Sequence, residues 1–326
     1  LNKYSRYRYK FRTLDLRKDG GGKLTNILAL LEDSSGDLWV STLQEGLYRF
    51  PGASGEEPGR LLRGDAVVLS IYESSDGDIY IGTANRGLMR YLPDSERFVQ
   101  VAQAFQVTDI HEDSNGTLWL ASFSGGIGEL DQGTNEVTYW EPQTAAGADW
   151  SFDARTIFED SRGNIWFGSD GGGMIKLLPD RTTFIRFTHD ADNLNSISSN
   201  QIYSICEDSA GLIWVATQNG LNRIDPESGE VKRYYEGELL PDNVVCSILE
   251  DESGDLWIST FSGLLRLDPM AETAFLYDVN DGIQDYEYLP AAACKGAGGR
   301  LYFGGVSGVD SFVPAELNSN PKPPNV

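Results

Sequence analysis

The sequence has few of the residues that metal chemistry and acid–base chemistry need. It holds two histidines, His111 and His189, and three cysteines, Cys206, Cys246 and Cys294, among 326 residues. The cysteines show no CxxC spacing, and each lies in an apolar run, which favours buried free thiols over a disulfide or a metal site. We therefore expect no bound metal and no cofactor.

Long apolar runs and positive charge are also scarce. No stretch of about 18 apolar residues occurs, so we expect no membrane insertion by this chain. The 26 Lys and Arg residues face 49 Asp and Glu residues, which gives a formal charge of −23. A surface this acidic repels phosphate backbones and anionic lipid, so nucleic acid is not an expected partner. A hydrophobic content of 40% nevertheless predicts a folded chain with a core.

The common catalytic motifs are absent as well. There is no GxSxG and no HExxH, and the glycine runs at 20–22 and 171–173 lack the spacing of a phosphate-binding loop. His111 lies in an apolar run and is expected to pack inside. His189 lies in an acidic loop and is the histidine best placed to act as a base, although a solvated loop histidine is the simpler interpretation. We expect no enzymatic activity from this chain.

What the sequence does contain is an internal repeat. Each copy reads as an apolar run, an acidic pair, a glycine turn and then an aromatic, apolar and small triplet, as in residues 27–42. The intervals between successive turn glycines are 39 to 48 residues, which is close to the period of a four-stranded propeller blade. The seven turn glycines are Gly36, Gly77, Gly116, Gly163, Gly211, Gly254 and Gly299.

The repeat predicts an all-β, seven-bladed propeller with four-stranded antiparallel blades. Most copies continue with a second glycine, a third strand and a more polar fourth strand, so the first strand of each blade is expected to be innermost. The last copy ends near Phe312 without a fourth strand. Residues 1–17 are expected to supply it, closing the ring three-plus-one and removing an open sheet edge. The propeller would span 1–317, with almost no helix, and 318–326 would be a linker.

The repeated residues themselves are predicted to be structural. The acidic pair and glycine fall at the hairpin between the first two strands, where they suit a turn better than a calcium site. The tryptophan of the second strand is expected to pack between blades rather than stack on a sugar. Its copies are Trp39, Trp119, Trp166, Trp214 and Trp257.

Ligand binding is expected on the propeller face that carries the loops between the second and third strands and the connections between blades. Amides, hydroxyls, carboxylates and a few aromatic rings suit a polyhydroxylated ligand, although ordinary solvated loops are the alternative at any one position. The candidate ligand-binding residues are Gln44, Asn85, Arg86, Phe123, Trp140, Trp150, Asp170, His189, Gln218, Asn219 and Phe261.

The repeat resembles the two-component regulator propeller family. The family pattern is met by residues 32–42, by Gly220–Pro226 and by Gly263–Pro269, and the last copy is similar to the family's terminal blade. The second blade departs from it, with Tyr72-Glu73-Ser74 and Tyr80 replacing Glu-Asp and Trp. Some members of the family carry two propellers in one chain. If the parent protein is of that kind, this chain is half of a double-propeller sensor.

The resemblance implies a periplasmic sensor module of a bacterial two-component-type signalling receptor. Residues 318–326 would lead into an immunoglobulin-like domain, followed by a transmembrane helix and an output such as a histidine kinase or a diguanylate cyclase. It also implies an oligosaccharide or similar polar ligand, and self-association through the parent receptor.

Two other functions stay open at this point. A non-catalytic scaffold for protein interactions would show a contiguous apolar patch on one face. A propeller-type lyase would use His189 with a nearby acid at the ring axis.

Overall fold

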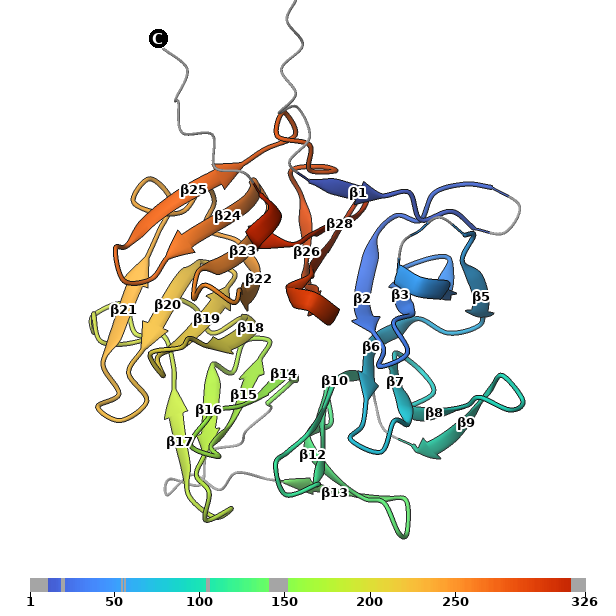
Figure 1. The fold of residues 1–326 in the computed structure, drawn as a ribbon. Coiled ribbons are helices and arrows are strands. Elements are labelled where there is room, and N and C mark those ends of the chain that lie inside the picture. The colour runs from blue at the N-terminus through green and yellow to red at the C-terminus, as the bar shows by residue number, and fades with distance from the viewer. Residues whose placement is uncertain are drawn as a thin grey trace, which may run out of the picture.

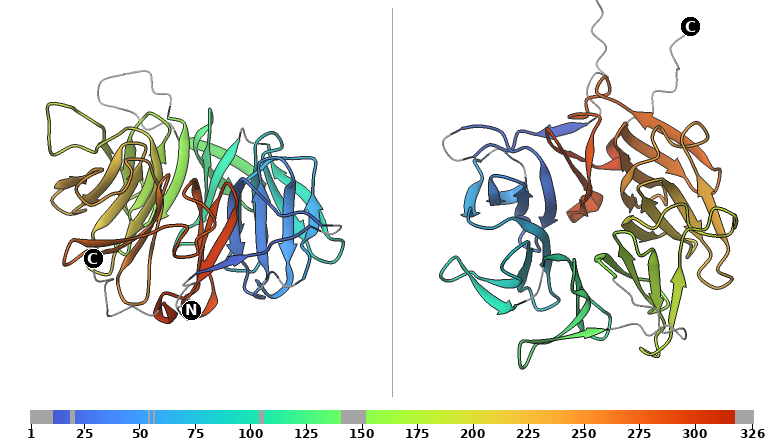
Figure 2. Two further views of the ribbon diagram at one scale, coloured as in Figure 1. Left: turned by 90° about the horizontal axis from the view of Figure 1, so that it is seen from above. Right: turned by 180° about the vertical axis from the view of Figure 1, so that it is seen from behind.

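The computed structural model describes residues 11–18, 21–53, 55, 57–103, 106–140 and 152–317. Within these residues, seven four-stranded antiparallel sheets stand around a central axis (Figures 1 and 2). The only helical segments described are three single 3-10 turns, η1 (Pro51–Ala53), η2 (Ala297–Gly299) and η3 (Pro314–Glu316). No helix in the described part is long and apolar enough to cross a bilayer. The prediction of a seven-bladed all-β propeller is confirmed.

The strands follow one order in every blade. The innermost strands are β2 (Ile27–Glu32), β6 (Val68–Glu73), β10 (Val107–Glu112), β14 (Ala154–Glu159), β18 (Ile202–Glu207), β22 (Val245–Glu250) and β26 (Tyr288–Lys295). The second strands are β3 (Leu38–Thr42), β7 (Ile79–Thr83), β11 (Leu118–Ser122), β15 (Ile165–Ser169), β19 (Ile213–Thr217), β23 (Leu256–Thr260) and β27 (Leu301–Gly305). The third strands are β4 (Gly46–Phe50), β8 (Leu88–Leu92), β12 (Gly126–Asp131), β16 (Met174–Leu177), β20 (Gly220–Ile224), β24 (Gly263–Asp268) and β28 (Gly308–Phe312). The outer strands are β5 (Arg60–Arg63), β9 (Arg97–Ala102), β13 (Glu136–Trp140), β17 (Phe184–Phe187), β21 (Val231–Tyr234), β25 (Thr273–Tyr277) and, in blade 7, β1 (Arg12–Leu14).

The first strand of the chain closes the last blade. β1 pairs antiparallel with β28, residues 12–14 against 309–311, where the blue and red ends of the ribbon meet in Figure 1. Phe11 anchors this closure because its buried ring lies edge-on to Tyr277 of blade 6 and Phe312 of blade 7, each 4.8 Å between centroids. The three-plus-one closure is therefore confirmed, with the paired stretch confined to three residues. The predicted linker 318–326 lies outside the described residues.

The hydrophobic core lies between adjacent blades rather than inside one blade. Every residue of the seven second strands is buried, and each core cluster combines side chains from neighbouring sheets. The five repeated tryptophans are at most 1% exposed. Their predicted packing role is confirmed, since an indole of this size fills the wedge between two twisted sheets.

The strand order gives the disc two different faces. The first-to-second hairpins and third-to-fourth turns lie on one face, here called the hairpin face. The second-to-third loops and the connections between blades lie on the other, the loop face. Near the loop face, each of the first six innermost strands carries a β-bulge at its second residue. A bulge leaves one residue out of the ladder and re-aims its side chain. The six bulge residues are Leu28, Leu69, Thr108, Arg155, Tyr203 and Cys246.

Deleting residues 1–17 is expected to lower the melting temperature and broaden the transition. The deletion leaves the edge of β28 unpaired and removes the Phe11 ring from a buried aromatic contact, a loss of about 3–5 kcal/mol for the ring alone. Differential scanning calorimetry of the parent and the truncated chain measures the effect. Phe11→Ala serves as the matched point variant and should reproduce a large part of the loss. Equal melting temperatures would contradict this closure.

Candidate functional site

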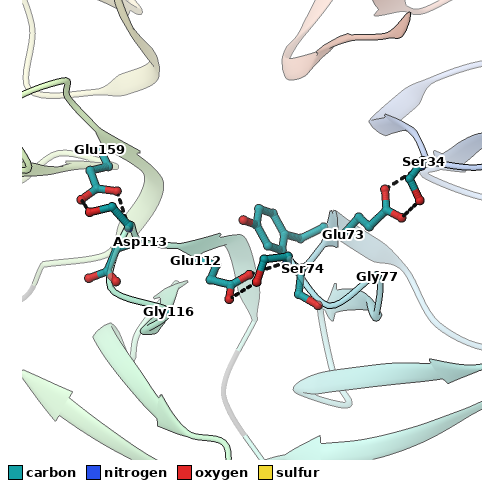
Figure 3. Close-up of a pocket in the computed structure, with 11 residues that line it drawn as sticks. Ser34, Glu73, Ser74, Gly77, Glu112, Asp113, Gly116 and Glu159 are labelled. Carbon is teal, nitrogen blue, oxygen red and sulfur yellow. Dashed lines mark hydrogen bonds between the residues drawn. The ribbon is translucent and has the colours of Figure 1, made fainter.

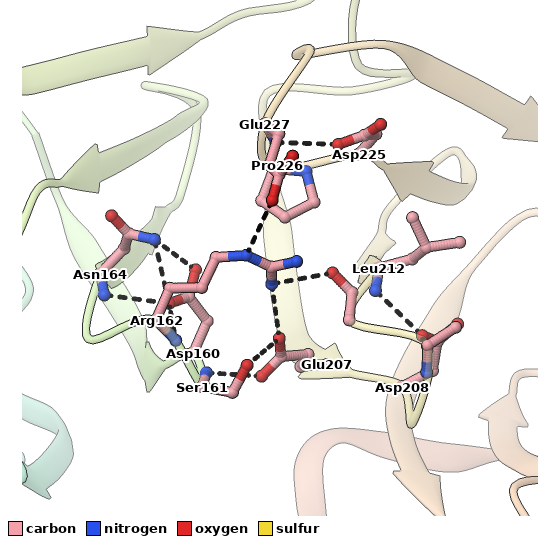
Figure 4. A network of polar contacts seen from close by, with 12 residues as sticks. Asp160, Ser161, Arg162, Asn164, Glu207, Asp208, Leu212, Asp225, Pro226 and Glu227 are labelled. Atoms are coloured by element: carbon pink, nitrogen blue, oxygen red, sulfur yellow. Dashed lines mark hydrogen bonds and ion pairs between the residues drawn. The ribbon is translucent and has the colours of Figure 1, made fainter.

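On the hairpin face, the repeated Asp and Trp side chains are bonded to each other. In blade 4, Asp160 Oδ1 accepts the backbone N–H groups of Arg162 and Asn164 at 3.0 and 2.9 Å, and Oδ2 accepts the indole N–H of Trp166 at 2.8 Å. Figure 4 shows the turn side of this arrangement. The Asp–Trp bond recurs at 2.7–2.9 Å in four further blades, as Asp33–Trp39, Asp113–Trp119, Asp208–Trp214 and Asp251–Trp257. The hairpin role predicted for the acidic pair is confirmed for its aspartate.

The glutamate of the acidic pair has a different role, which sequence reasoning missed. Its carboxylate accepts from the hairpin of the preceding blade, as where Glu207 accepts the amide of Ser161 at 2.6 Å and its hydroxyl at 2.7 Å (Figure 4). We call this contact the blade clasp. The other clasps are Glu73–Ser34, Glu112–Ser75, Glu159–Ser114, Glu250–Ser209 and Glu32–Ala297, the last two through the amide alone.

A cavity of about 590 Å³ opens on the hairpin face among the hairpins of blades 1 to 4. Tyr72 and the carboxylates of Glu73, Glu112 and Glu159 line it, and Figure 3 shows the carboxylates turned to their clasp partners along the wall. The carboxylate oxygens that line this cavity are therefore already engaged in holding the ring together. In the described part of the chain, no group of three or more His, Cys, Asp or Glu side chains is arranged to hold a metal ion.

Farther out on the hairpin face, third-to-fourth turns reach back to the preceding blade. Arg181 of blade 4 donates to Asp113 of blade 3 at 2.8 Å, and Glu272 of blade 6 accepts from Arg223 of blade 5 at 3.0 Å. Arg162 approaches Glu227 of the next blade at 3.6 Å (Figure 4). These charged side chains of the hairpin face thus join neighbouring blades.

On the loop face, most of the predicted ligand-binding residues are exposed. The side chains of four amides form no hydrogen bond with the residues that the structure describes, and these are Gln44, Asn85, Gln218 and Asn219. Arg86 is exposed and forms an ion pair with Asp65 at 2.9 Å. Phe261 is exposed and Phe123 is half-buried. These residues come from the second-to-third loops of blades 1, 2, 3, 5 and 6.

The remaining candidates have more defined surroundings. Trp140 is half-buried, lies 5.3 Å from the Trp119 ring, and donates its indole N–H to Glu129 at 3.1 Å, so it packs between blades 3 and 4. His189 is exposed, and its Nδ1 lies 2.8 Å from the carbonyl oxygen of Ile197. Because a carbonyl only accepts, Nδ1 is the donor in this contact. Trp150 lies outside the described residues.

Asp170 is brought into a cluster that sequence reasoning did not identify. Its Oδ1 accepts from Gln201 Nε2 at 2.6 Å, and its Oδ2 lies 3.7 Å from Arg155 Nη1. The Arg155 guanidinium lies over the Tyr203 ring, 4.5 Å from the centroid. We call these four side chains the Arg155 cluster. Aligning the repeats gives a signal for it, because Arg155 is the one charged side chain among the six bulge residues.

Blade 3 places two titratable groups on its innermost strand. Burial raises the pKa of Asp109 to about 6, although its carboxylate accepts the backbone N–H groups of Ile110 and, across the blade junction, Ile157. Burial lowers the pKa of His111, and its buried Nε2 has no hydrogen-bond partner among the described residues. His111 is thus packed, as expected, and its ring lies edge-on to Tyr72 at 6.3 Å.

The fold and repeat place the chain among the β-propeller repeat proteins. A family model described as "Two component regulator propeller" matches five segments, in blades 1, 2, 4, 5 and 6: residues 21–44, 62–85, 153–171, 196–219 and 239–262. The chain belongs to the two-component regulator propeller family. A comparison with curated proteins gave no significant match.

Solved structures support the same fold. The extracellular domain of the hybrid two-component system BT3049 from B. thetaiotaomicron is 23% identical with a TM-score of 0.82, and the match covers 96% of this chain and 42% of that one. Virginiamycin B lyase from Staphylococcus aureus is 17% identical with a TM-score of 0.69, covering 92% and 97%. The chain thus spans less than half of the BT3049 domain, and both matches are similarities of fold.

The Asp–Trp pair is expected to behave as one coupled unit. Asp208→Ser leaves the buried Trp214 indole N–H without its acceptor, and Trp214→Tyr leaves a carboxylate oxygen unpaired, each costing about 2–4 kcal/mol. The double variant reproduces the Ser74 and Tyr80 found in blade 2, and should cost about 1–2 kcal/mol less than the sum of the single changes. Urea unfolding of the four proteins measures the coupling. Additive losses would contradict it.

The Asp109 carboxyl predicts a specific pH dependence. Its pKa is raised from 3.8 to about 6 on folding, so its favourable contribution is complete below pH 4 and is lost as the pH rises through 6. About two pKa units correspond to about 3 kcal/mol. The stability of Asp109→Asn relative to the parent should therefore increase between pH 4.5 and pH 7.5. Denaturant unfolding at both values tests this, with the exposed Asp94→Asn as control. A difference that does not change with pH would contradict it.

Proposed function

We propose that this chain is the extracytoplasmic, periplasmic sensing module of a bacterial two-component-type receptor. It binds a small polar ligand, of the oligosaccharide class, and passes the signal to membrane and output parts of the parent receptor, through which it self-associates. The observation that carries the proposal is the family repeat in five of seven blades. The extracellular location stated for the BT3049 domain, which has the same fold, supports it.

The loop face is the better location for the ligand. Glutamates and arginines of the hairpin face are occupied by clasps and ion pairs between blades, as in Glu207–Ser161 and Arg181–Asp113. On the loop face, exposed amide side chains such as those of Gln44 and Gln218 form no hydrogen bond with a described residue, so their donors and acceptors are available to a ligand. A ligand that bonds to these groups would not have to break a contact that holds the ring.

A lyase function has one observation in its favour, the fold similarity to virginiamycin B lyase. His189 is exposed and uses only Nδ1 in a contact with the described residues, so its Nε2 faces no competing protein group. The neighbouring Asp190, however, uses Oδ1 to accept the amide of Asp192 in a local turn. No described carboxylate hydrogen-bonds to the His189 ring, so the site lacks the second acid–base group. We propose that this chain is not an enzyme.

A thermal-shift screen against neutral and acidic oligosaccharides, with product analysis of each mixture, tests the proposed function. A ligand at one hundred times its Kd adds about 2.7 kcal/mol to the free energy of unfolding, which raises the melting temperature by several degrees. We expect a shift without cleavage. Cleavage of a ligand would replace the sensor with a lyase. No shift with any oligosaccharide would contradict ligand sensing and favour a scaffold for protein interactions.

A further inference from the structure

The Arg155 cluster departs from the repeat at the place where the innermost strands reach the loop face. Four of the other bulge residues are Leu28, Leu69, Thr108 and Cys246, none of which carries a charge. Arg155 instead extends a guanidinium along the neighbouring blade, over the Tyr203 ring, 4.5 Å from its centroid. The guanidinium therefore bridges the innermost strands of blades 4 and 5.

Two side chains of the cluster, Arg155 and Asp170, have hydrogen-bonding groups that no described residue occupies. Arg155 forms no hydrogen bond with any residue that the structure describes, and its side chain is 29% exposed. The distance of 3.7 Å between Nη1 and Asp170 Oδ2 is too long for a hydrogen bond. Asp170 Oδ1 is occupied by Gln201, while Oδ2 has no donor among the described residues. The Arg155 donor and the Asp170 Oδ2 acceptor thus lie side by side without bonding to each other.

The same contacts hold these groups in place. Tyr203 is 8% exposed, so its ring is a fixed support for the planar guanidinium. The backbone N–H of Asp170 donates to Asp153 at 2.9 Å, and Gln201 orients the carboxylate from the next blade. Pre-ordered groups lose little entropy when a ligand binds, so this arrangement suits recognition.

We propose that Arg155 and Asp170 bind one hydroxyl group of a neutral sugar carrying vicinal hydroxyls. The hydroxyl oxygen accepts from Arg155 Nη1, and its proton is donated to Asp170 Oδ2. The adjacent hydroxyl accepts from a second N–H of the planar guanidinium fork. The inference rests on the proposed function and identifies a subsite and a ligand class for it.

A neutral ligand fits this subsite better than an anionic one. The Asp170 carboxylate lies beside the guanidinium, with Oδ2 3.7 Å from Nη1. An anionic group bonded to Arg155 would lie close to this negative charge, well within one Debye length, about 8 Å at physiological ionic strength. A hydroxyl uses the carboxylate as an acceptor instead.

Three variants test the subsite. Arg155→Gln removes the guanidinium donors, and Asp170→Asn keeps an oxygen for Gln201 but replaces the second carboxylate oxygen with an N–H group. Arg60→Ala, at an exposed arginine of the outer strand β5, is the matched control. Isothermal titration calorimetry is run with cellobiose, xylobiose and galactobiose as neutral probes and with digalacturonate as the acidic probe. Circular dichroism melting checks that each variant is folded.

We expect at least one neutral disaccharide to bind the parent, with affinity reduced about tenfold or more in both Arg155→Gln and Asp170→Asn and unchanged in Arg60→Ala. Binding of a neutral sugar that neither variant weakens would overturn this subsite and leave the proposed function intact. Tighter binding of digalacturonate to Asp170→Asn than to the parent, with no neutral sugar bound, would identify an anion site and overturn the inference. Absence of binding by all four probes would count against the subsite and the oligosaccharide ligand together.

A second readout separates a direct contact from a structural effect. In protein labelled with ¹⁵N-arginine, the Arg155 guanidinium resonance is assigned by its loss in Arg155→Lys. Addition of the neutral disaccharide should shift this resonance and leave that of Arg60 unchanged. A bound sugar that leaves the Arg155 resonance unmoved would show that this side chain does not contact the ligand.

Discussion

The buried hydrogen bond between a turn aspartate and a tryptophan of the second strand is the interaction on which the blades depend. A buried indole N–H needs an acceptor, and a buried carboxylate needs several donors, so neither residue is tolerated alone. In blade 2 the aspartate position is Ser74 and the tryptophan position is Tyr80. In blade 7 the aspartate position is Gly296 and the tryptophan position is Tyr302, whose hydroxyl donates to Glu32 at 2.5 Å. The two positions thus change together, as a mutual requirement predicts.

The same hairpins also join the blades into a ring. Each hairpin is fixed inside its blade by the aspartate, which places the next residue's amide and hydroxyl where the glutamate of the following blade accepts them, as in Asp160, Ser161 and Glu207. Between blades 6 and 7 both positions differ, with Glu252 at the serine position and Lys295 at the glutamate position. The hairpin face is therefore constrained at the six junctions that carry a clasp, and the loop face can vary.

The period and patterning of the sequence were enough to predict the fold. Seven glycine turns at regular intervals, together with a polar fourth strand missing from the last copy, predicted the blades and their closure. The blade clasp was missed because it joins residues about 40 positions apart, and one copy of a repeat does not show which neighbour it contacts. Trp140 stands outside the repeat pattern, so the sequence does not show that its ring packs on Trp119. The Arg155 cluster was missed because the β-bulge that re-aims its side chain leaves no mark on the hydrophobic periodicity.

Departures from the repeat are of two kinds, and the distinction bears on where function lies. Blade 3 has Glu129 where the third strands of blades 1, 2, 4, 5 and 6 have Arg or Lys, and the structure compensates for it, since Trp140 donates to Glu129 and Arg181 of blade 4 supplies a cation to Asp113. A compensated departure restores the contacts of the repeat and serves stability. Arg155 is different, because a guanidinium replaces an uncharged side chain and no described residue takes up its hydrogen bonds. The Arg155 side chain is partly exposed, so a bound partner can take up its donors without breaking a contact of the fold.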